Sequence, residues 1–246
     1  MRSWVFVRAP VLILALTLVS GYAGSAAPPG GSWQVVLAAG DDAEPVFDDA
    51  TRALARRLAA SGVPAANIHR LSASRGELHH GIEPATAENL IHQIADLPAR
   101  TGDRCFVFMT SHGEHNAGLW LALSQRALRP EELAQALSSG CGMVPTVVIV
   151  SGCYTGGFAA GEMAEPNRII LTAARRDRPS FGCQVERTYT VFDQCLLGAL
   201  PQSANWQAVF NRTRRCVGRQ EHARGELPSE PQAYFGSAVA DMRVAF

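Results

Sequence analysis

The sequence predicts a three-layer α/β domain, in which helices cover both faces of a mostly parallel sheet. Two observations predict this class. Short apolar segments of strand length alternate along the chain with longer amphipathic segments of helical period. The short segments are apolar throughout rather than at every second position, which is typical of strands buried on both faces. Such strands need a layer of helices on each side of the sheet.

Six segments have the composition of buried strands. The first ends at Gly40 and Asp41, and the others are also bounded by small, polar or turn-forming residues. The apolar runs are too short for buried helices, so we assign them to the sheet. The predicted strands are residues 33–39, 68–71, 104–110, 146–150, 168–172 and 234–239.

Five segments have the apolar period of amphipathic helices. In the first, Ala50, Leu54 and Leu58 fall on one stripe. Pro98 ends the second helix, because proline cannot continue it, and Pro130 opens the third, where the first turn tolerates proline. The predicted helices are residues 48–60, 86–97, 130–137, 188–200 and 203–219, and residues 72–84 are expected to form a loop.

The composition suits one domain behind an export signal. The chain has 22 basic and 22 acidic side chains, so it offers no electrostatic footprint for nucleic acid. Residues 1–27 combine Arg2 and Arg8 with an apolar stretch and a final run of small residues, which is the pattern of a signal peptide. We therefore expect domain 28–246 to be secreted or periplasmic in a bacterium, with no stable membrane association after cleavage. An uncleaved anchor is the alternative.

Six cysteines in an exported chain predict disulfides. Cys153 is expected to stay free for the chemistry described below. Cys105 lies inside a predicted core strand and is expected to be a buried free thiol. The four that remain can pair in three ways, which the sequence leaves open: they are Cys141, Cys183, Cys195 and Cys216.

Two consecutive strands end at residues suited to nucleophilic chemistry. Strand 104–110 leads to His112 and Gly113, and strand 146–150 leads to Cys153. The carboxyl ends of parallel strands meet at one edge of a sheet, so these side chains are expected to lie close together. Acyl transfer by cysteine needs an imidazole and backbone donors for the oxyanion. We expect His112 and Cys153 to act together, with the N–H groups of Gly113 and Cys153 as those donors.

This pattern resembles the caspase-like clan of cysteine peptidases, and most closely the legumain family, which includes the catalytic subunit of the GPI transamidase. In that family a strand ends in His-Gly and the next strand ends in Ala-Cys-x-Ser-Gly or a near variant. The corresponding segments here are Thr110–Ser111–His112–Gly113 and Ser151–Gly152–Cys153–Tyr154–Thr155–Gly156. The resemblance extends from Trp33 to about Leu200. It implies a six-stranded caspase-like sheet, a His112/Cys153 dyad, and hydrolysis of peptide or protein substrates through a thioester, without a metal or organic cofactor.

Some positions depart from the family pattern and bear on specificity. Gly152 stands in place of the usual Ala, and Ser151 in place of an acidic residue. Aligned with the family, Asp48 takes the place of a basic residue of the substrate pocket, Asp193 falls on an acidic pocket position and Ser180 on a small polar one. Two carboxylates in one pocket favour a cation, because an unpaired buried charge is costly. The resemblance therefore implies cleavage after Arg or Lys rather than Asn. The alternative is that Asp48 caps a helix and Asp193 is a solvated helix charge.

Two other functions remain open and two are disfavoured. An amine acting as acyl acceptor would make the protein a peptide ligase or transamidase, and loss of catalysis would make it a peptide-binding module. An α/β-hydrolase is disfavoured, because its elbow requires Gly where this chain has Ser151 and its catalytic His follows the nucleophile. Zinc binding is disfavoured, because His112 and His115 lack the His-Glu-x-x-His spacing.

Overall fold

The computed structural model of the 246-residue chain describes residue 1, residues 31–184 and residues 186–246. The expected signal peptide, residues 1–27, lies outside the described residues apart from Met1. Among the described residues, none of the helices combines the length and the apolar character that crossing a membrane requires.

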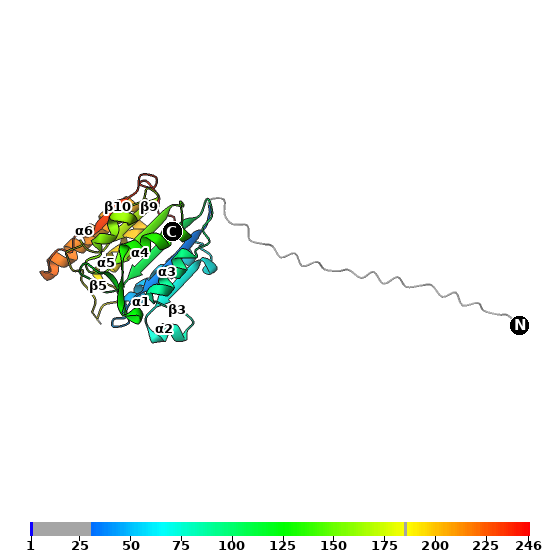
Figure 1. Ribbon diagram of the computed structural model, residues 1–246, viewed down its shortest axis with the longest axis horizontal. Coiled ribbons are helices and arrows are strands. Elements are labelled where there is room, and N and C mark those ends of the chain that lie inside the picture. The colour runs from blue at the N-terminus through cyan, green and yellow to red at the C-terminus, as the bar shows by residue number, and fades with distance from the viewer. Residues whose placement is uncertain (2–30, 185) are drawn as a thin grey trace.

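A seven-stranded sheet forms the centre of the molecule (Figure 1), in the order β10-β9-β8-β4-β1-β2-β3. Neighbouring strands are parallel, except that β10 runs antiparallel to β9. The prediction of an α/β fold with a mostly parallel sheet is confirmed. The strands are β1 Trp33–Ala39, β2 Ile68–Ser72, β3 Glu83–Pro84, β4 Arg104–Thr110, β8 Thr146–Ser151, β9 Arg168–Thr172 and β10 Gln232–Phe235.

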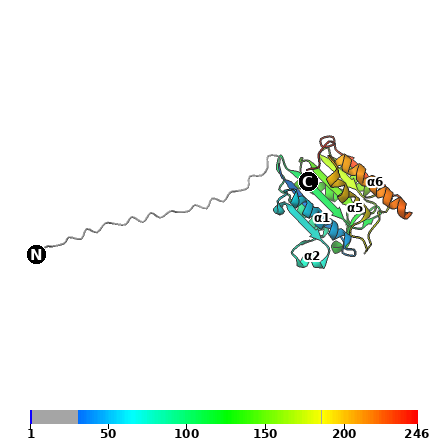
Figure 2. The same ribbon diagram turned by 180° about the vertical axis from the view of Figure 1, so that it is seen from behind.

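Helices cover both faces of this sheet. On one face lie α1 (Val46–Ala60), α5 (Val191–Ala199) and α6 (Trp206–Arg224), which are in front in Figure 2. On the other lie α3 (Ala87–Ala95) and α4 (Pro130–Gly140). Successive side chains of β4 point to opposite faces of the sheet. Phe106 and Phe108 belong to the core under α1 and α5, and Val107 and Met109 belong to the core under α3 and α4. The strands are therefore apolar at every position because both faces are buried.

The segment expected to be a loop, residues 72–84, is partly ordered. It contains the short helix α2 (Arg75–His79) and the two-residue strand β3, which adds one strand to the six expected. Elements this short carry no detectable apolar period in the sequence. Short 3₁₀ segments connect the larger elements of the described chain: Ala65–Asn67, Ala122–Ser124, Thr155–Ala159, Gly161–Met163 and Leu200–Gln202.

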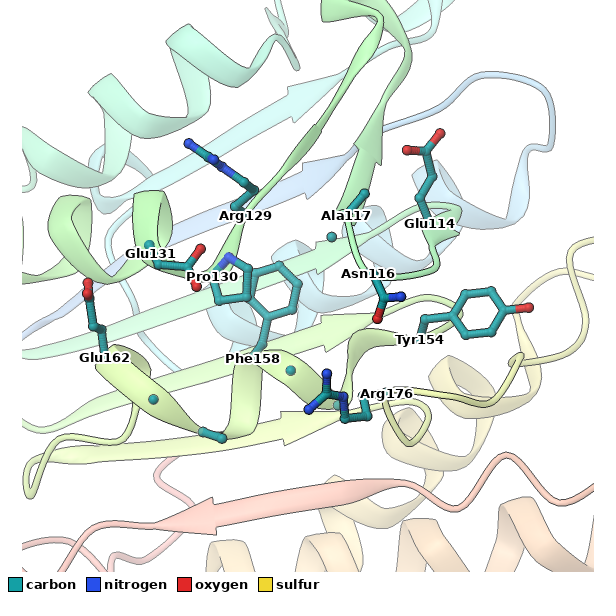
Figure 3. A pocket seen from close by; sticks show the side chains of 15 residues that line it. Glu114, Asn116, Ala117, Arg129, Pro130, Glu131, Tyr154, Phe158, Glu162 and Arg176 are labelled. Carbon is teal, nitrogen blue, oxygen red and sulfur yellow. The ribbon is translucent and has the colours of Figure 1, made fainter.

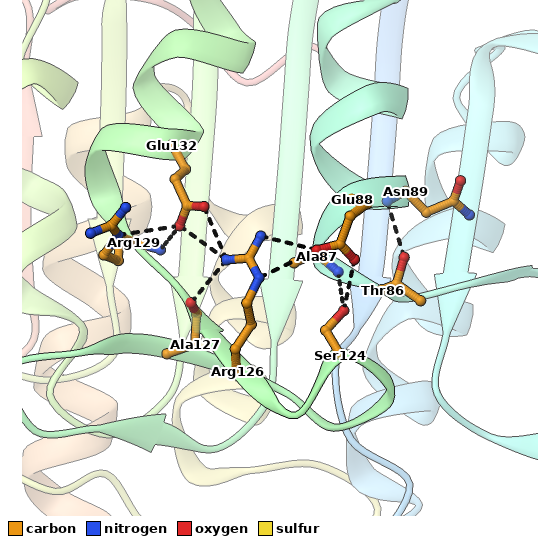
Figure 4. A network of polar contacts seen from close by, with 9 residues as sticks. All are labelled: Thr86, Ala87, Glu88, Asn89, Ser124, Arg126, Ala127, Arg129 and Glu132. Atoms are coloured by element: carbon orange, nitrogen blue, oxygen red, sulfur yellow. Dashed lines mark hydrogen bonds and ion pairs between the residues drawn. The ribbon is translucent and has the colours of Figure 1, made fainter.

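A small antiparallel sheet stands beside the carboxyl end of β4. It consists of β5 (Gly113–Glu114), β6 (Gly118–Leu121) and β7 (Arg126–Leu128). Figure 4 shows how Arg126 ties it to the helices, since its guanidinium bonds Glu88 at the start of α3 and Glu132 in the first turn of α4. Ser124 accepts from the Ala87 N–H at 2.7 Å and donates to Glu88. The small sheet, whose first strand follows His112, is therefore anchored to both helices of that face.

The disulfides differ from the expectation. Cys105 pairs with Cys141, with their Cα atoms 6.0 Å apart, and Cys195 pairs with Cys216. The prediction that Cys105 is a free thiol is wrong. Its side chain points from β4 toward the helix layer that contains α4, and Cys141 directly follows that helix. The free cysteines are Cys153 and Cys183.

Removal of the Cys105–Cys141 bridge is expected to destabilise the protein. The bridge joins residues 36 positions apart, and closing a loop of that length restricts the unfolded chain by about 3–4 kcal/mol. The Cys105→Ala/Cys141→Ala variant should unfold at lower urea concentration than the wild type. As a check on the pairing, thiol titration of the unfolded, unreduced wild type should find the two free thiols. A count of four would contradict the assignment.

Candidate active site

The pairing of β4 with β8 aligns the two candidate catalytic loops. The strands are parallel neighbours, and Thr110 is the partner of Ser151 at their carboxyl ends. The Ser111 N–H then donates to the Ser151 carbonyl at 3.0 Å. His112 and Cys153 each come two residues after the last pair, so they leave the sheet at the same edge and the same level.

Backbone contact between the two loops explains the glycine after His112. A Cβ atom on Gly113 would lie 1.8 Å from the Cys153 carbonyl oxygen, so no other residue fits. The Trp120 N–H donates to the His112 carbonyl at 2.9 Å, which makes Gly113 and Leu119 a non-hydrogen-bonded pair of the small sheet. The Gly113 N–H therefore points away from β6.

The Cys153 side chain is half-buried and lies against Ser180. The Ser180 N–H donates to Cys153 Sγ at 3.2 Å, and the thiol donates to the Ser180 carbonyl at 3.4 Å. Burial raises the pKa of the Cys153 thiol, which therefore stays protonated at neutral pH. In the described part of the chain no hydrogen bond joins Cys153 to His112. The next residue, Tyr154, has a left-handed φ of 61°, and its N–H donates to the Arg178 carbonyl at 2.9 Å.

His112 rests on an aromatic residue that the sequence did not single out. Its ring meets the buried Phe47 ring edge to face, with centroids 5.3 Å apart and planes at 83°. Phe47 belongs to the first turn of α1. In the sequence it is one more apolar residue at the start of a helix, and nothing distinguishes it from an ordinary core residue.

Asp193 is fully buried at the start of α5, with an exposed fraction of 0%. Its Oδ2 accepts from Thr110 Oγ1 at 2.8 Å, at the end of β4, and its Oδ1 has no partner among the described residues. Burial raises the pKa of Asp193 to about 6. The alternative of a solvated helix charge is therefore wrong, and the helix cap is Thr190, whose hydroxyl accepts from the Asp193 N–H.

Asp48 is also buried, at 5% exposure, in the first turn of α1. The residue at the cap position is Pro45, so the alternative of a capping role for Asp48 is wrong. Its Oδ2 accepts from Ser72 Oγ at 3.0 Å, and its Oδ1 lies 3.9 Å from Arg70 Nη2. Burial raises the pKa of Asp48. Arg70 is shared, because it also bonds Glu77 at 2.8 Å.

Cys183, which the sequence assigned to a disulfide, is a free thiol in negative surroundings. Burial raises its pKa to about 12, and Cys153, Asp193, Glu44 and Asp41 raise it further. Glu44 is half-buried, and its Oε2 has no partner in the described chain. Carboxylates from the loop before α1 and from α5 thus lie around one thiol close to Cys153.

An open cleft of about 640 Å³ adjoins the two candidate catalytic loops and extends toward α4 (Figure 3). Glu114 and Tyr154, the residues after Gly113 and Cys153, form one end of its wall, and Phe158 and Pro130 form the apolar part. The walls come from four segments that are separate in the sequence, so no local sequence pattern could reveal them. His115 packs edge to face against Tyr154 and bonds Asn116. The described residues contain no group of three or more His, Cys, Asp or Glu that could hold a metal ion.

Replacement of Asp193 by Asn should change how stability depends on pH. A carboxyl whose pKa rises from 3.8 to about 6 on folding stabilises the native state when protonated, and this contribution is lost as the pH rises through 6. The unfolding free energy of Asp193→Asn relative to wild type should therefore increase between pH 4 and 7.5, by up to about 3 kcal/mol. Urea denaturation at both pH values measures this. The control Asp241→Asn, at an exposed site, should show no such trend. If the unfolding free energy of Asp193→Asn relative to wild type decreased with pH, the raised pKa of Asp193 would be contradicted.

Comparison with known proteins agrees with this geometry. The model of the peptidase C13 family matches residues 87–237, a range that contains both candidate catalytic loops and Asp193. No curated protein matches the chain. Among solved structures, caspase-1 from Spodoptera frugiperda superposes with a TM-score of 0.57 at 12% identity, over 84% of this chain and 86% of that one. At this identity the likeness shows the fold alone, which is caspase-like.

The family match covers more than half of the chain and includes β4, β8 and the loops that follow them. The chain therefore belongs to the peptidase C13 family and is a cysteine-type peptidase.

Proposed function

We propose that Cys153 is the nucleophile of this peptidase and that His112 is its acid–base partner. The observation that carries the proposal is the backbone contact between Gly113 and the Cys153 carbonyl, because it brings the two strand ends together. The Gly113 N–H points away from β6, and the Cys153 N–H has no carbonyl partner in the described chain. Within the described chain both N–H groups are therefore available as donors, which supports their role in stabilising the oxyanion.

The reaction follows from this arrangement. The buried thiol is protonated in the free enzyme, so His112 removes its proton as the sulfur attacks the scissile carbonyl. The N–H groups of Gly113 and Cys153 hold the oxyanion, and His112 passes the proton to the leaving amine. Water then hydrolyses the thioester. The edge-on contact with Phe47 restricts the orientation of the imidazole.

Cys153→Ala and His112→Ala should each lower kcat by at least about a hundredfold, because each removes a group that moves a proton or forms the thioester. Hydrolysis of a fluorogenic peptide by the purified protein measures this. His92→Ala, in the exposed part of α3, is the matched histidine control and should leave kcat unchanged. Full turnover by Cys153→Ala would contradict the mechanism. Transfer of the acyl group to an added amine in preference to water would favour the transamidase alternative.

We also propose that the enzyme cleaves after Arg or Lys. Two carboxylate oxygens around Cys183, Glu44 Oε2 and Asp193 Oδ1, lack hydrogen-bond partners among the described residues. Asp48 Oδ1 has only the distant Arg70 Nη2, at 3.9 Å. Unpaired buried carboxylates destabilise a protein, and a substrate cation would neutralise them. Asp193 is fully buried in the free enzyme, so it acts on the cation through its charge rather than by contact. Ser180, which borders Cys153 Sγ, lies beside the bond to be cut.

Peptides that differ only at the residue before the cut should be cleaved faster with Arg or Lys than with Asn. The ratio of kcat/KM for Arg to that for Asn should rise as the pH passes about 6, because Asp193 then becomes charged. Asp193→Asn should flatten this pH dependence, whereas the control Asp241→Asn should not. A preference for Asn across the whole pH range would rule out the proposed specificity while leaving the catalytic dyad untouched.

A further inference from the structure

Every charged side chain on the exposed surface of α6 is basic, although the chain as a whole is neutral. Glu221, the one acidic residue of this helix, is buried at 2% exposure. The positive charge is therefore concentrated on the solvent side of α6. The exposed arginines of the helix are Arg212, Arg214, Arg215, Arg219 and Arg224.

Three of these arginines line a groove between α5 and α6. The groove has a volume of about 310 Å³, and Arg212, Arg215 and Arg219 form one of its sides. The opposite side comes from α5 and includes Gly198, which has no side chain to fill the space. No carboxylate lines the groove, and within the described residues none of the three arginines makes an ion pair. We name this feature the arginine groove.

The floor of the arginine groove is covalently fixed. The Cys195–Cys216 disulfide joins α5 to α6 at this place, and both cysteines line the groove. Gln220 Nε2 lies 3.3 Å from Cys195 Sγ and donates to it. The backbone positions of the arginines therefore do not depend on a flexible loop, so a ligand would order their side chains without having to order the backbone.

Two further arginines extend the positive charge toward the active site. Gln220 Oε1 accepts from Arg224 at 3.3 Å and from Arg187 at 3.5 Å, so the two guanidinium groups share one acceptor. Burial lowers the pKa of Arg187, and the positive charge of Arg224 lowers it further. Arg187 lies four residues after Cys183, in the segment that continues from Ser180. The basic surface thus begins near the candidate active site and follows α6, which is about 28 Å long.

We propose that the arginine groove binds an acidic segment of a protein substrate, at a distance from the bond that is cut. This inference rests on the proposed peptidase function. Guanidinium groups bind carboxylates through two parallel hydrogen bonds. The three arginines of the groove repel one another and have no counter-charge nearby in the described chain, so an acidic ligand would relieve this repulsion. The groove is concave, and α6 carries no large exposed apolar side chain among the described residues. A polypeptide with Asp and Glu side chains fits this surface better than a membrane does.

The first test measures binding in the Cys153→Ala background, so that cleavage cannot interfere. Fluorescence anisotropy with a labelled Glu-rich peptide should show binding that weakens with salt. The Arg212→Gln/Arg215→Gln/Arg219→Gln variant should raise the Kd about tenfold, which is about 1.4 kcal/mol. The matched control Arg56→Gln/Arg75→Gln/Arg100→Gln removes the same charge from exposed sites elsewhere and should leave the Kd unchanged.

The second test measures turnover with Cys153 present. For the groove variant, kcat/KM should fall on a protein substrate with an acidic segment and stay unchanged on a short neutral peptide. Equal loss in both triple variants, or no binding of the Glu-rich peptide, would overturn the proposal. A third outcome would also overturn it: the wild-type groove binds phosphatidylglycerol vesicles, the groove variant does not, and neither binds the Glu-rich peptide. Failure of the peptidase mechanism would appear differently, as turnover that survives in Cys153→Ala.

Discussion

The parallel pairing of β4 with β8 is the constraint on which the rest of the site depends. Because Thr110 is in register with Ser151, the two loops that follow leave the sheet at the same level. Gly113 then meets the Cys153 carbonyl so closely that any side chain would collide with it. The small sheet that contains Gly113 is held in turn by Arg126 of β7 and its two glutamate partners. A shift of one residue in this register would move one loop along the sheet edge relative to the other.

Charge is distributed unevenly in a chain whose formal charge is zero. Carboxylates gather around Cys183, and two of their oxygens lack hydrogen-bond partners among the described residues. Arginines gather on α6, where the acidic residue of the helix is buried. We propose that the two regions attract substrate groups of opposite charge. Net charge alone hides both features, because they cancel in the sum.

The cysteines show how strand alternation decides chemistry. Cys105 lies on β4 with its side chain toward α3 and α4, and this direction brings it to Cys141 at the end of α4. From the sequence it was expected to be a free thiol, because it lies within an apolar strand. The face of the strand, and not its apolar character, determines the partner. Cys183 is left free as a result and borders the candidate active site.

The sequence by itself determined the α/β class, the bounds of β1 and β9, and the position of His112 and Cys153 just after two strands. These features depend on local apolar periodicity and turn residues, which each segment contains within itself. Only the tertiary structure decided that Phe47 supports His112, that Cys183 lies among carboxylates close to Cys153, and that α5 and α6 enclose a basic groove. Each of these depends on contacts between segments far apart in the chain, which local periodicity does not encode.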